Sequence, residues 1–172
     1  LEFRRVLFRS EIAVGRLDGD ACGDIVAGTA TGPGVVRGFL SSSTGISTKP
    51  YRSFTAFPAP SNSGVRLTAA DFGSLVGATW TPGVLDGRSE IVVGTGGGSR
   101  ATVQVWDVAA APRIVRTILP FAAGFQGGVT LSVGRYDADL VPEIFVGAGV
   151  GGGSAVEIWS ATRSEEHTSE LQ

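Results

Sequence analysis

The sequence predicts an all-β chain built from repeats, a partial β-propeller of about two and two-thirds four-stranded blades. Glycine is unusually frequent, with 26 glycines in 172 residues, about twice the usual ~7%. Short segments that alternate valine or isoleucine with polar residues lie between glycine-rich turn signals, a pattern typical of strands. An acidic segment followed by an apolar run recurs three times, which indicates a repeat array.

The acidic segment is the most distinctive feature of the repeat. Residues 134–149 read GRYDADLVPEIFVGAG, and residues 15–28 read GRLDGDACGDIVAG. A third copy runs from residue 70 to residue 94 and carries about eleven extra residues near 73–85. Nine of the twelve acids in residues 11–162 lie in these segments, namely Asp18, Asp20, Asp24, Asp71, Asp86, Glu90, Asp137, Asp139 and Glu143.

The repeat length supports the propeller interpretation. Residues 57–65 match residues 121–129 at an offset of 64, and removal of the insertion leaves 64 − 11 = 53 residues. Repeats of about this length with four strands each are typical of propeller blades. We therefore assign the blades to residues 11–64, 65–128 and, in part, 129–162.

The strands follow in the same order in each copy. In the first copy they are expected at residues 12–14, 25–27, 35–40 and 51–57, with a hairpin loop at 41–49. In the second copy they are expected at 65–69, 91–93, 103–106 and 113–119. In the third copy they are expected at 129–133, 144–146 and 155–159.

The two ends of the chain differ from the repeats. Residues 1–10 (LEFRRVLFRS) and 163–172 (RSEEHTSELQ) can be encoded by reverse-complementary DNA, and they resemble the translated read-through of a sequencing adapter. We set both ends aside from the fold prediction as artefacts. On this interpretation residues 11–162 are an internal piece of a longer protein, and the third copy stops before its fourth strand.

The copies resemble FG-GAP-type repeats, which occur in the integrin alpha-chain propeller and in secreted bacterial proteins. The resemblance covers nearly all of residues 11–162 and rests on the carboxylate spacing, the glycine turn, the tryptophan-ending strand and the crossing segment, which recur in one order. It implies a calcium-binding acidic loop in each copy and an extracellular or cell-surface location. It also implies that further blades of the parent chain would complete the fold.

Calcium suits these loops chemically, because it takes six to eight oxygen ligands, mostly carboxylates and backbone carbonyls. Three converging carboxylates also need a cation, since two like charges ~4 Å apart repel by roughly 4 kcal/mol at an effective dielectric near 20. The metal ligands implied by the resemblance are the nine acids named above, together with the backbone carbonyls of Cys22 and Val141.

Two departures from the family pattern leave the calcium prediction open. Arg16 and Arg135 stand where the family has its first acidic ligand, and an arginine there could replace the metal with an ion pair. Ala21 and Leu140 stand where the family has a glycine, and a left-handed backbone is costly for both. The alternative is a solvated acidic turn bridged by arginine.

Several function classes are disfavoured. The one histidine of the chain is His167, so a Ser-His-Asp triad cannot form within residues 11–162, and the repetition of the acid pairs argues against a single active site. One lysine and no basic cluster disfavour nucleic-acid binding, and no apolar run is long enough for a membrane span. Residues 147–152 match a dinucleotide fingerprint, but that motif must open a helix, whereas residues 155–159 alternate like a strand.

The sequence therefore predicts a non-catalytic, calcium-stabilised repeat module that presents loops for protein or carbohydrate binding. The alternatives are an accessory propeller of a secreted hydrolase and a metal-free scaffold in which Arg16 and Arg135 replace the ion. Trp106 and Trp159 are expected in the core between blades, and Trp80 is either a loop anchor or a ligand contact. Because blade faces and edges would stay uncovered, we expect the isolated piece to aggregate.

Overall fold

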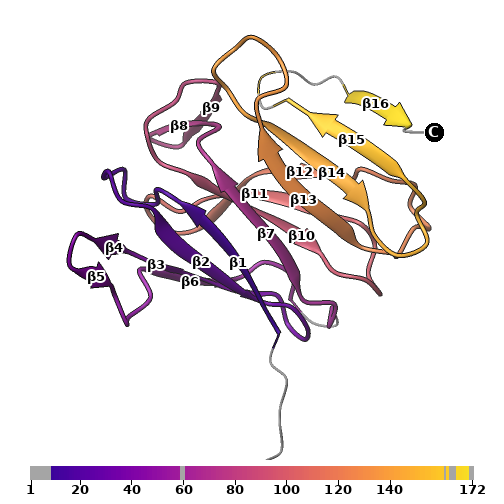
Figure 1. Ribbon diagram of the computed structural model, residues 1–172, viewed down its shortest axis with the longest axis horizontal. Coiled ribbons are helices and arrows are strands. Elements are labelled where there is room, and N and C mark those ends of the chain that lie inside the picture. Colours follow the sequence, from indigo (N-terminus) through magenta and orange to yellow (C-terminus); the bar gives the residue numbers. More distant parts are fainter. Residues whose placement is uncertain (1–8, 59–60, 161, 163–165, 171–172) are drawn as a thin grey trace, which may run out of the picture.

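The structure is a computed structural model that describes residues 9–58, 61–160, 162 and 166–170. Every regular element among these residues is a β-strand, which confirms the all-β prediction. Figure 1 shows the strands in three sheets that follow one another in chain order. No helix in the described part of the chain is long and apolar enough to cross a membrane.

Each of the three sheets has four strands, and all neighbouring strands are antiparallel. The first sheet has the order β1 (Ser10–Gly15), β2 (Asp24–Thr29), β3 (Val35–Phe39) and β6 (Arg52–Thr55). The second has the order β7 (Val65–Ala70), β10 (Glu90–Thr95), β11 (Val103–Asp107) and β12 (Arg113–Ile118). The third has the order β13 (Val129–Gly134), β14 (Glu143–Ala148), β15 (Ala155–Trp159) and β16 (Glu166–Glu170).

The strand registers show that the three sheets are copies of one unit. The first strand of each sheet ends opposite the acid that begins the second strand, in the pairs Gly15–Asp24, Ala70–Glu90 and Gly134–Glu143. One residue further along, an isoleucine faces an aromatic residue on the third strand, in the pairs Ile25–Phe39, Ile91–Trp106 and Ile144–Trp159. The recurrence predicted from the sequence thus holds at the level of single residues.

The sheets pack face to face through two hydrophobic cores. The core between the first and second sheets contains Leu17, Val26, Val36, Val65, Leu67, Ile91, Val93 and Trp106. The core between the second and third sheets contains Phe72, Val92, Val103, Val105, Val129, Ile144, Val146 and Trp159. The two tryptophans therefore lie in the cores between sheets, as predicted.

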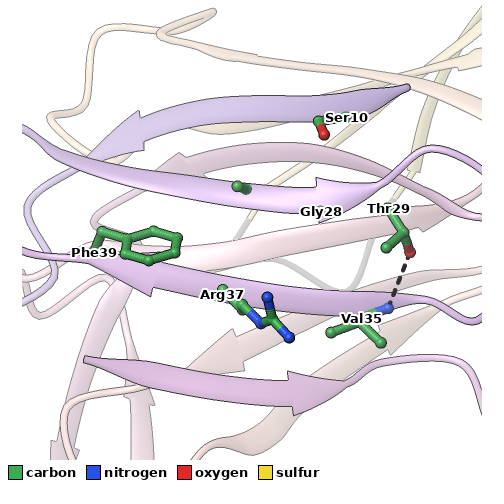
Figure 2. Close-up of a pocket in the computed structure, with 7 residues that line it drawn as sticks. Ser10, Gly28, Thr29, Val35, Arg37 and Phe39 are labelled. Atoms are coloured by element: carbon green, nitrogen blue, oxygen red, sulfur yellow. Dashed lines mark hydrogen bonds between the residues drawn. The ribbon is translucent and has the colours of Figure 1, made fainter. Parts of the chain in front are cut away.

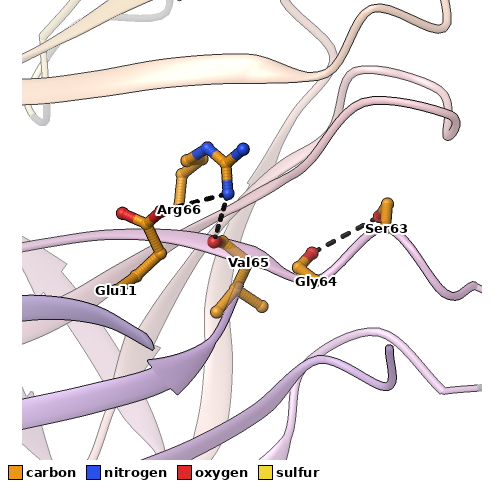
Figure 3. A network of polar contacts seen from close by, with 5 residues as sticks. All are labelled: Glu11, Ser63, Gly64, Val65 and Arg66. Carbon is orange, nitrogen blue, oxygen red and sulfur yellow. Dashed lines mark hydrogen bonds and ion pairs between the residues drawn. The ribbon is translucent and has the colours of Figure 1, made fainter. Parts of the chain in front are cut away.

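The first strands of the sheets, β1, β7 and β13, are neighbours in space, with β7 between the other two (Figure 1). At the β1–β7 seam the Arg66 guanidinium donates to the backbone carbonyl of Val65 at 2.9 Å and forms an ion pair with Glu11 at 3.2 Å (Figure 3). Both charged side chains are about one-third exposed, so this pair adds little to stability. The buried apolar residues on these strands are Val65 and Leu67 of β7 and Val129 of β13.

Two features were not predicted. The insertion after Asp71 forms a hairpin of its own, β8 (Gly73–Val76) and β9 (Thr79–Pro82). The smaller hairpin of β4 (Ser41–Ser42) and β5 (Gly45–Ile46), by contrast, lies within the hairpin loop expected at residues 41–49. The fourth strand of the third sheet, β16, is formed by residues that the sequence analysis set aside. The free edge of β15 offers unpaired backbone groups, and an extended segment can pair with them.

Candidate metal sites

The three acidic loops share one structural anchor. In each copy the acid that begins the second strand accepts a hydrogen bond from a backbone N–H near the start of its own loop. The bonds are Leu17 N–H to Asp24 at 2.7 Å, Phe72 N–H to Glu90 at 2.8 Å, and Tyr136 N–H to Glu143 at 2.6 Å. Donor and acceptor are separated by 7, 18 and 7 residues, so the second loop carries 18 − 7 = 11 extra residues, the insertion size inferred from the sequence.

The third loop brings its three acids together. One carboxylate oxygen from each of Asp137, Asp139 and Glu143 lies within 4.8 Å of the other two. Glu143 is buried, whereas both aspartates are exposed. Among the described residues this is the only group of three potential metal-ligating side chains that converges in this way. Three carboxylate oxygens at the mouth of a loop form a donor set that suits a hard cation such as calcium.

Short-range hydrogen bonds give the third loop its shape. Asp137 accepts the backbone N–H of Asp139 at 2.9 Å, and Asp139 accepts the backbone N–H of Val141 at 2.8 Å. These are two successive Asx turns, which aspartate favours because its short side chain reaches its own backbone two residues on. Each aspartate uses one oxygen for its turn, and its second oxygen is available to a ligand.

The first loop has the same turns but does not converge. Asp18 accepts the N–H of Asp20 at 3.1 Å, and Asp20 accepts the N–H of Cys22 at 2.7 Å. Asp24 is fully buried, and its two oxygens accept backbone N–H groups of Leu17 and Ser41 at 2.7 and 2.8 Å. Backbone amides thus already compensate the negative charge of Asp24.

The second loop is divided by its insertion. Asp71 accepts the N–H of Gly87 at 2.7 Å, and Asp86 accepts the N–H of Arg88 at 2.9 Å. The other oxygen of Asp71, Oδ1, is buried and has no hydrogen-bond partner in the described part of the chain. The β8–β9 hairpin lies between these two acids in sequence, so the pair depends on the fold of the insertion.

Burial raises the pKa values of acids in and beside the second loop. It raises the pKa of Glu90 to about 9, and the nearby charges of Asp71, Asp107 and Asp86 add to the shift. Burial also raises the pKa of Asp71 and of Asp107 above the ordinary range. Glu90 is therefore protonated at neutral pH when no cation is bound, because its carboxylate would be both desolvated and surrounded by like charges.

Asp107 is the site residue that sequence reasoning missed. It lies at the end of β11 outside the acidic loop and is only 3% exposed, and its Oδ1 atom has no hydrogen-bond partner among the residues that the structure describes. The register places it where the other copies have Leu40 and Ser160. The signal in the sequence was an aspartate at a position where the other two copies have leucine and serine.

The arginines do not replace the metal by pairing with the loop acids. Neither Arg16 nor Arg135 forms an ion pair with a loop carboxylate among the described residues. Instead, the backbone of Arg16 links two loops, because its N–H donates to Ser89 Oγ at 3.0 Å and its carbonyl accepts the N–H of Ser89 at 2.6 Å. No described residue other than glycine has a positive φ, so Ala21 and Leu140 avoid the left-handed conformation.

The tryptophans serve packing. Trp106 and Trp159 each donate an indole N–H to the residue two positions earlier, Gln104 at 3.0 Å and Glu157 at 2.9 Å. Trp80, on β9, is half-buried against the core between the second and third sheets. This placement agrees with the loop-anchor interpretation of Trp80.

The geometry thus distinguishes the three loops: the carboxylates of the third loop converge, Asp24 of the first loop is held by backbone amides, and Glu90 of the second loop is buried with a raised pKa. No protein-family model and no curated protein sequence matches this chain.

Proposed function

We propose that this chain is part of a β-propeller of FG-GAP-type blades, stabilised by calcium, that presents its loops to a protein or carbohydrate ligand outside the cell. Three observations support the propeller. The sheets have one strand order, they share one register, and their first strands lie side by side. Propeller blades are built in this way around a central channel.

The convergence of Asp137, Asp139 and Glu143 carries the calcium proposal. The two exposed aspartates keep their loop shape through one oxygen each, so a cation can bind without unfolding the loop. A site with few protein ligands and several waters binds calcium weakly, in the 10⁻⁴–10⁻³ M range of extracellular modules. Such a site is filled where calcium is millimolar, which supports the extracellular proposal.

The first loop favours a second candidate role, a metal-free structural turn. Asp24 is fully buried and its two oxygens already accept backbone amides. We therefore propose that the third loop binds calcium and that the first loop keeps its shape without it. A mixed array of this kind remains a structural and binding module, and we propose no catalytic role for it.

Hydroxyl groups gather beside the first loop, where a polar ligand could bind. A hollow of about 500 Å³ there is lined by Asp18 and Asp20 and by the hydroxyl residues Ser41, Ser42, Thr44 and Ser47. Carboxylate and hydroxyl oxygens are hydrogen-bonding partners for sugars and for polar peptide segments. This hollow is our candidate for the ligand-presenting surface.

Terbium luminescence tests the calcium site directly, because terbium replaces calcium and is excited by a nearby aromatic residue. Tyr136 precedes Asp137 and its N–H is bonded to Glu143, so it is the natural sensitiser. We expect terbium emission that excess calcium abolishes and that Asp137→Asn with Asp139→Asn removes. Tyr136→Phe should lose the emission while calcium still stabilises the protein. Emission that survives the double asparagine variant would place the ion elsewhere and contradict the proposal.

A further inference from the structure

An aspartate followed by a glycine occurs twice in the chain, as Asp18–Gly19 in the first acidic loop and as Asp86–Gly87 in the second. Both glycines have a φ of +82°. Each aspartate accepts the backbone N–H two positions on, at 3.1 Å in the first loop and 2.9 Å in the second. This turn holds each carboxyl group over the peptide bond that follows it. The two pairs of residues therefore share one local conformation, in which the glycine nitrogen lies next to the aspartate side chain.

The two pairs differ at the glycine nitrogen. The N–H of Gly87 donates to Asp71 Oδ2 at 2.7 Å. Gly19 is exposed, and no described residue accepts its N–H. A peptide nitrogen that attacks a carboxyl carbon must give up its proton. An ionised Asp71 opposes the negative charge that results, and a protonated Asp71 cannot take up the proton, so the hydrogen bond slows attack by the nitrogen of Gly87.

A positive charge lies beside Gly19. The side chain of Arg88 extends from the second loop to the first, where a Cβ on Gly19 would lie 3.2 Å from Arg88 Cγ and 3.5 Å from Arg88 Nε. The guanidinium group stays charged at all ordinary pH values, and a positive charge favours the negative charge that develops on the nitrogen. Both the missing hydrogen bond and the nearby arginine therefore make the nitrogen of Gly19 the more reactive of the two.

The surroundings of Gly19 do not depend on the open face of the first sheet. That face has a hollow of about 240 Å³ across β1, β2 and β3, where a further blade of the proposed propeller would lie (Figure 2). None of the residues that line this hollow belongs to the first acidic loop. Gly19 instead faces Arg88 of the second loop, a neighbour that the chain itself supplies.

We propose that Asp18 isomerises spontaneously to isoaspartate in the folded protein and that Asp86 is protected. The nitrogen of Gly19 forms a bond to Asp18 Cγ, its proton passes to solvent, and one carboxyl oxygen leaves as water, which gives a cyclic imide. The turn supplies the proximity that this step needs. Water then adds to the main-chain carbonyl of Asp18 and breaks its bond to Gly19, so that the chain runs through Cγ. Addition of water at Cγ instead restores aspartate.

Isomerisation changes the shape of the first loop. It inserts the Cβ of Asp18 into the main chain and leaves the α-carboxylate as the side group, so the hydrogen bond from the N–H of Asp20 is lost. Asp18 and Asp20 line the hollow of about 500 Å³ beside the β4–β5 hairpin. The modification would therefore alter the proposed ligand-presenting surface, although the reaction itself does not depend on that function.

Incubation of the full chain at neutral pH, both folded and in guanidinium chloride, tests the proposal within one molecule. EDTA is present throughout, so calcium does not affect the comparison. Trypsin then releases residues 17–37 and 67–88 as separate peptides, and electron-transfer fragmentation distinguishes isoaspartate from aspartate. In the folded protein we expect isoaspartate to form at Asp18 at least ~10-fold faster than at Asp86, since attack by Gly87 sacrifices a hydrogen bond. In the denaturant both sites should react at similar rates.

Equal rates at the two sites of the folded protein, or no isoaspartate at Asp18, would overturn the proposal. Asp18→Glu is the control for the assignment, because it keeps the charge but would have to close a larger ring. Isoaspartate should disappear from residues 17–37 of this variant. If the same amount remained, it would come from Asp20 or Asp24, and the assignment would be wrong.

Asp71→Ala tests the protection of the second loop, because it frees the N–H of Gly87. We expect the rate at Asp86 in this variant to rise towards the rate at Asp18. A rate at Asp86 that stays low in a cooperatively folding Asp71→Ala protein would show that Asp71 does not protect it and would contradict the proposal. If this variant does not fold, the comparison of the folded and denatured wild type still decides between the outcomes.

Discussion

Gly94 lies directly beneath Val129, so close that a Cβ on Gly94 would come 2.3 Å from Val129 Cγ2. The two residues belong to adjacent sheets, and the absence of one side chain allows the other to pack. Gly28 and Val65 repeat the relationship at 2.4 Å. These two glycines therefore recur because the packing between sheets leaves no room for a side chain. Glycines at the turns instead provide a backbone conformation that other residues rarely adopt.

Replacement of Gly94 by alanine should destabilise the protein by about 1–3 kcal/mol, because an added methyl group overpacks a filled core. Gly94 has no positive φ, so backbone strain does not contribute to the effect. Gly124→Ala is the control, since its Cβ would meet nothing within 4 Å and its φ is not positive. Urea unfolding of the two variants gives the comparison. Equal stabilities for Gly94→Ala and Gly124→Ala would refute the packing role.

Trp80 should anchor the inserted hairpin to the core between the second and third sheets. It lines a small gap with Phe72, Val105, Arg116 and Ile144. Because Trp80 is only half-buried, Trp80→Ala should cost less than the 3–5 kcal/mol typical of a fully buried tryptophan, about 1–3 kcal/mol. Val76→Ala in the same hairpin, at a residue that is 72% exposed, should change stability by less than ~0.5 kcal/mol. Equal effects of the two changes would show that Trp80 is not an anchor.

Stability without calcium should fall as the pH rises, because the folded state raises the pKa of Glu90 from its ordinary 4.5 to about 9. The folded protein holds this proton more tightly than the unfolded chain. The stabilisation is therefore complete below pH 4.5 and is lost as the pH rises towards 9. The raised pKa values of Asp71 and Asp107 act in the same direction.

Glu90→Gln isolates this contribution, because the amide oxygen can still accept the N–H of Phe72. Chemical unfolding in the presence of EDTA at pH 5, 7 and 9 should show a shallower pH dependence for Glu90→Gln than for the wild type. Glu11→Gln, at the partly exposed β1–β7 seam, is the control and should keep the wild-type slope. A Glu90→Gln slope equal to the wild type would mean that Glu90 is ionised in the folded protein.

The sequence was sufficient to predict the class of structure and the period of the repeat, because both depend on local patterns. Alternating apolar residues predicted the strands, and the carboxylate spacing predicted the matching positions of Asp24, Glu90 and Glu143, which the registers confirm. Strand ends were predicted less well, since most strands extend one or two residues into the flanking turns.

The site was harder to predict, because convergence of side chains depends on tertiary geometry. Asp24 and Glu143 occupy the same register position, yet Asp24 uses both oxygens on backbone amides and Glu143 joins two aspartates. Asp107 approaches the second loop from a different strand, so no motif within that loop includes it. The β8–β9 hairpin breaks the repeat and could not be inferred from the other copies.

The central claim, a calcium site in the third loop, is tested most directly by thermal unfolding with and without calcium. Asp137→Asn with Asp139→Asn removes two charges and keeps an acceptor oxygen for each turn. Asp18→Asn with Asp20→Asn is the matched control in the first loop. At 10 mM calcium, a site with a Kd of 10⁻⁴–10⁻³ M stabilises the protein by about 1.4–2.7 kcal/mol, or roughly 3–10 °C in Tm for a chain of this size. We predict this shift for the wild type and the first-loop variant and its loss in the third-loop variant. A wild-type Tm that calcium does not change, or an equal shift in the third-loop variant, would contradict the claim.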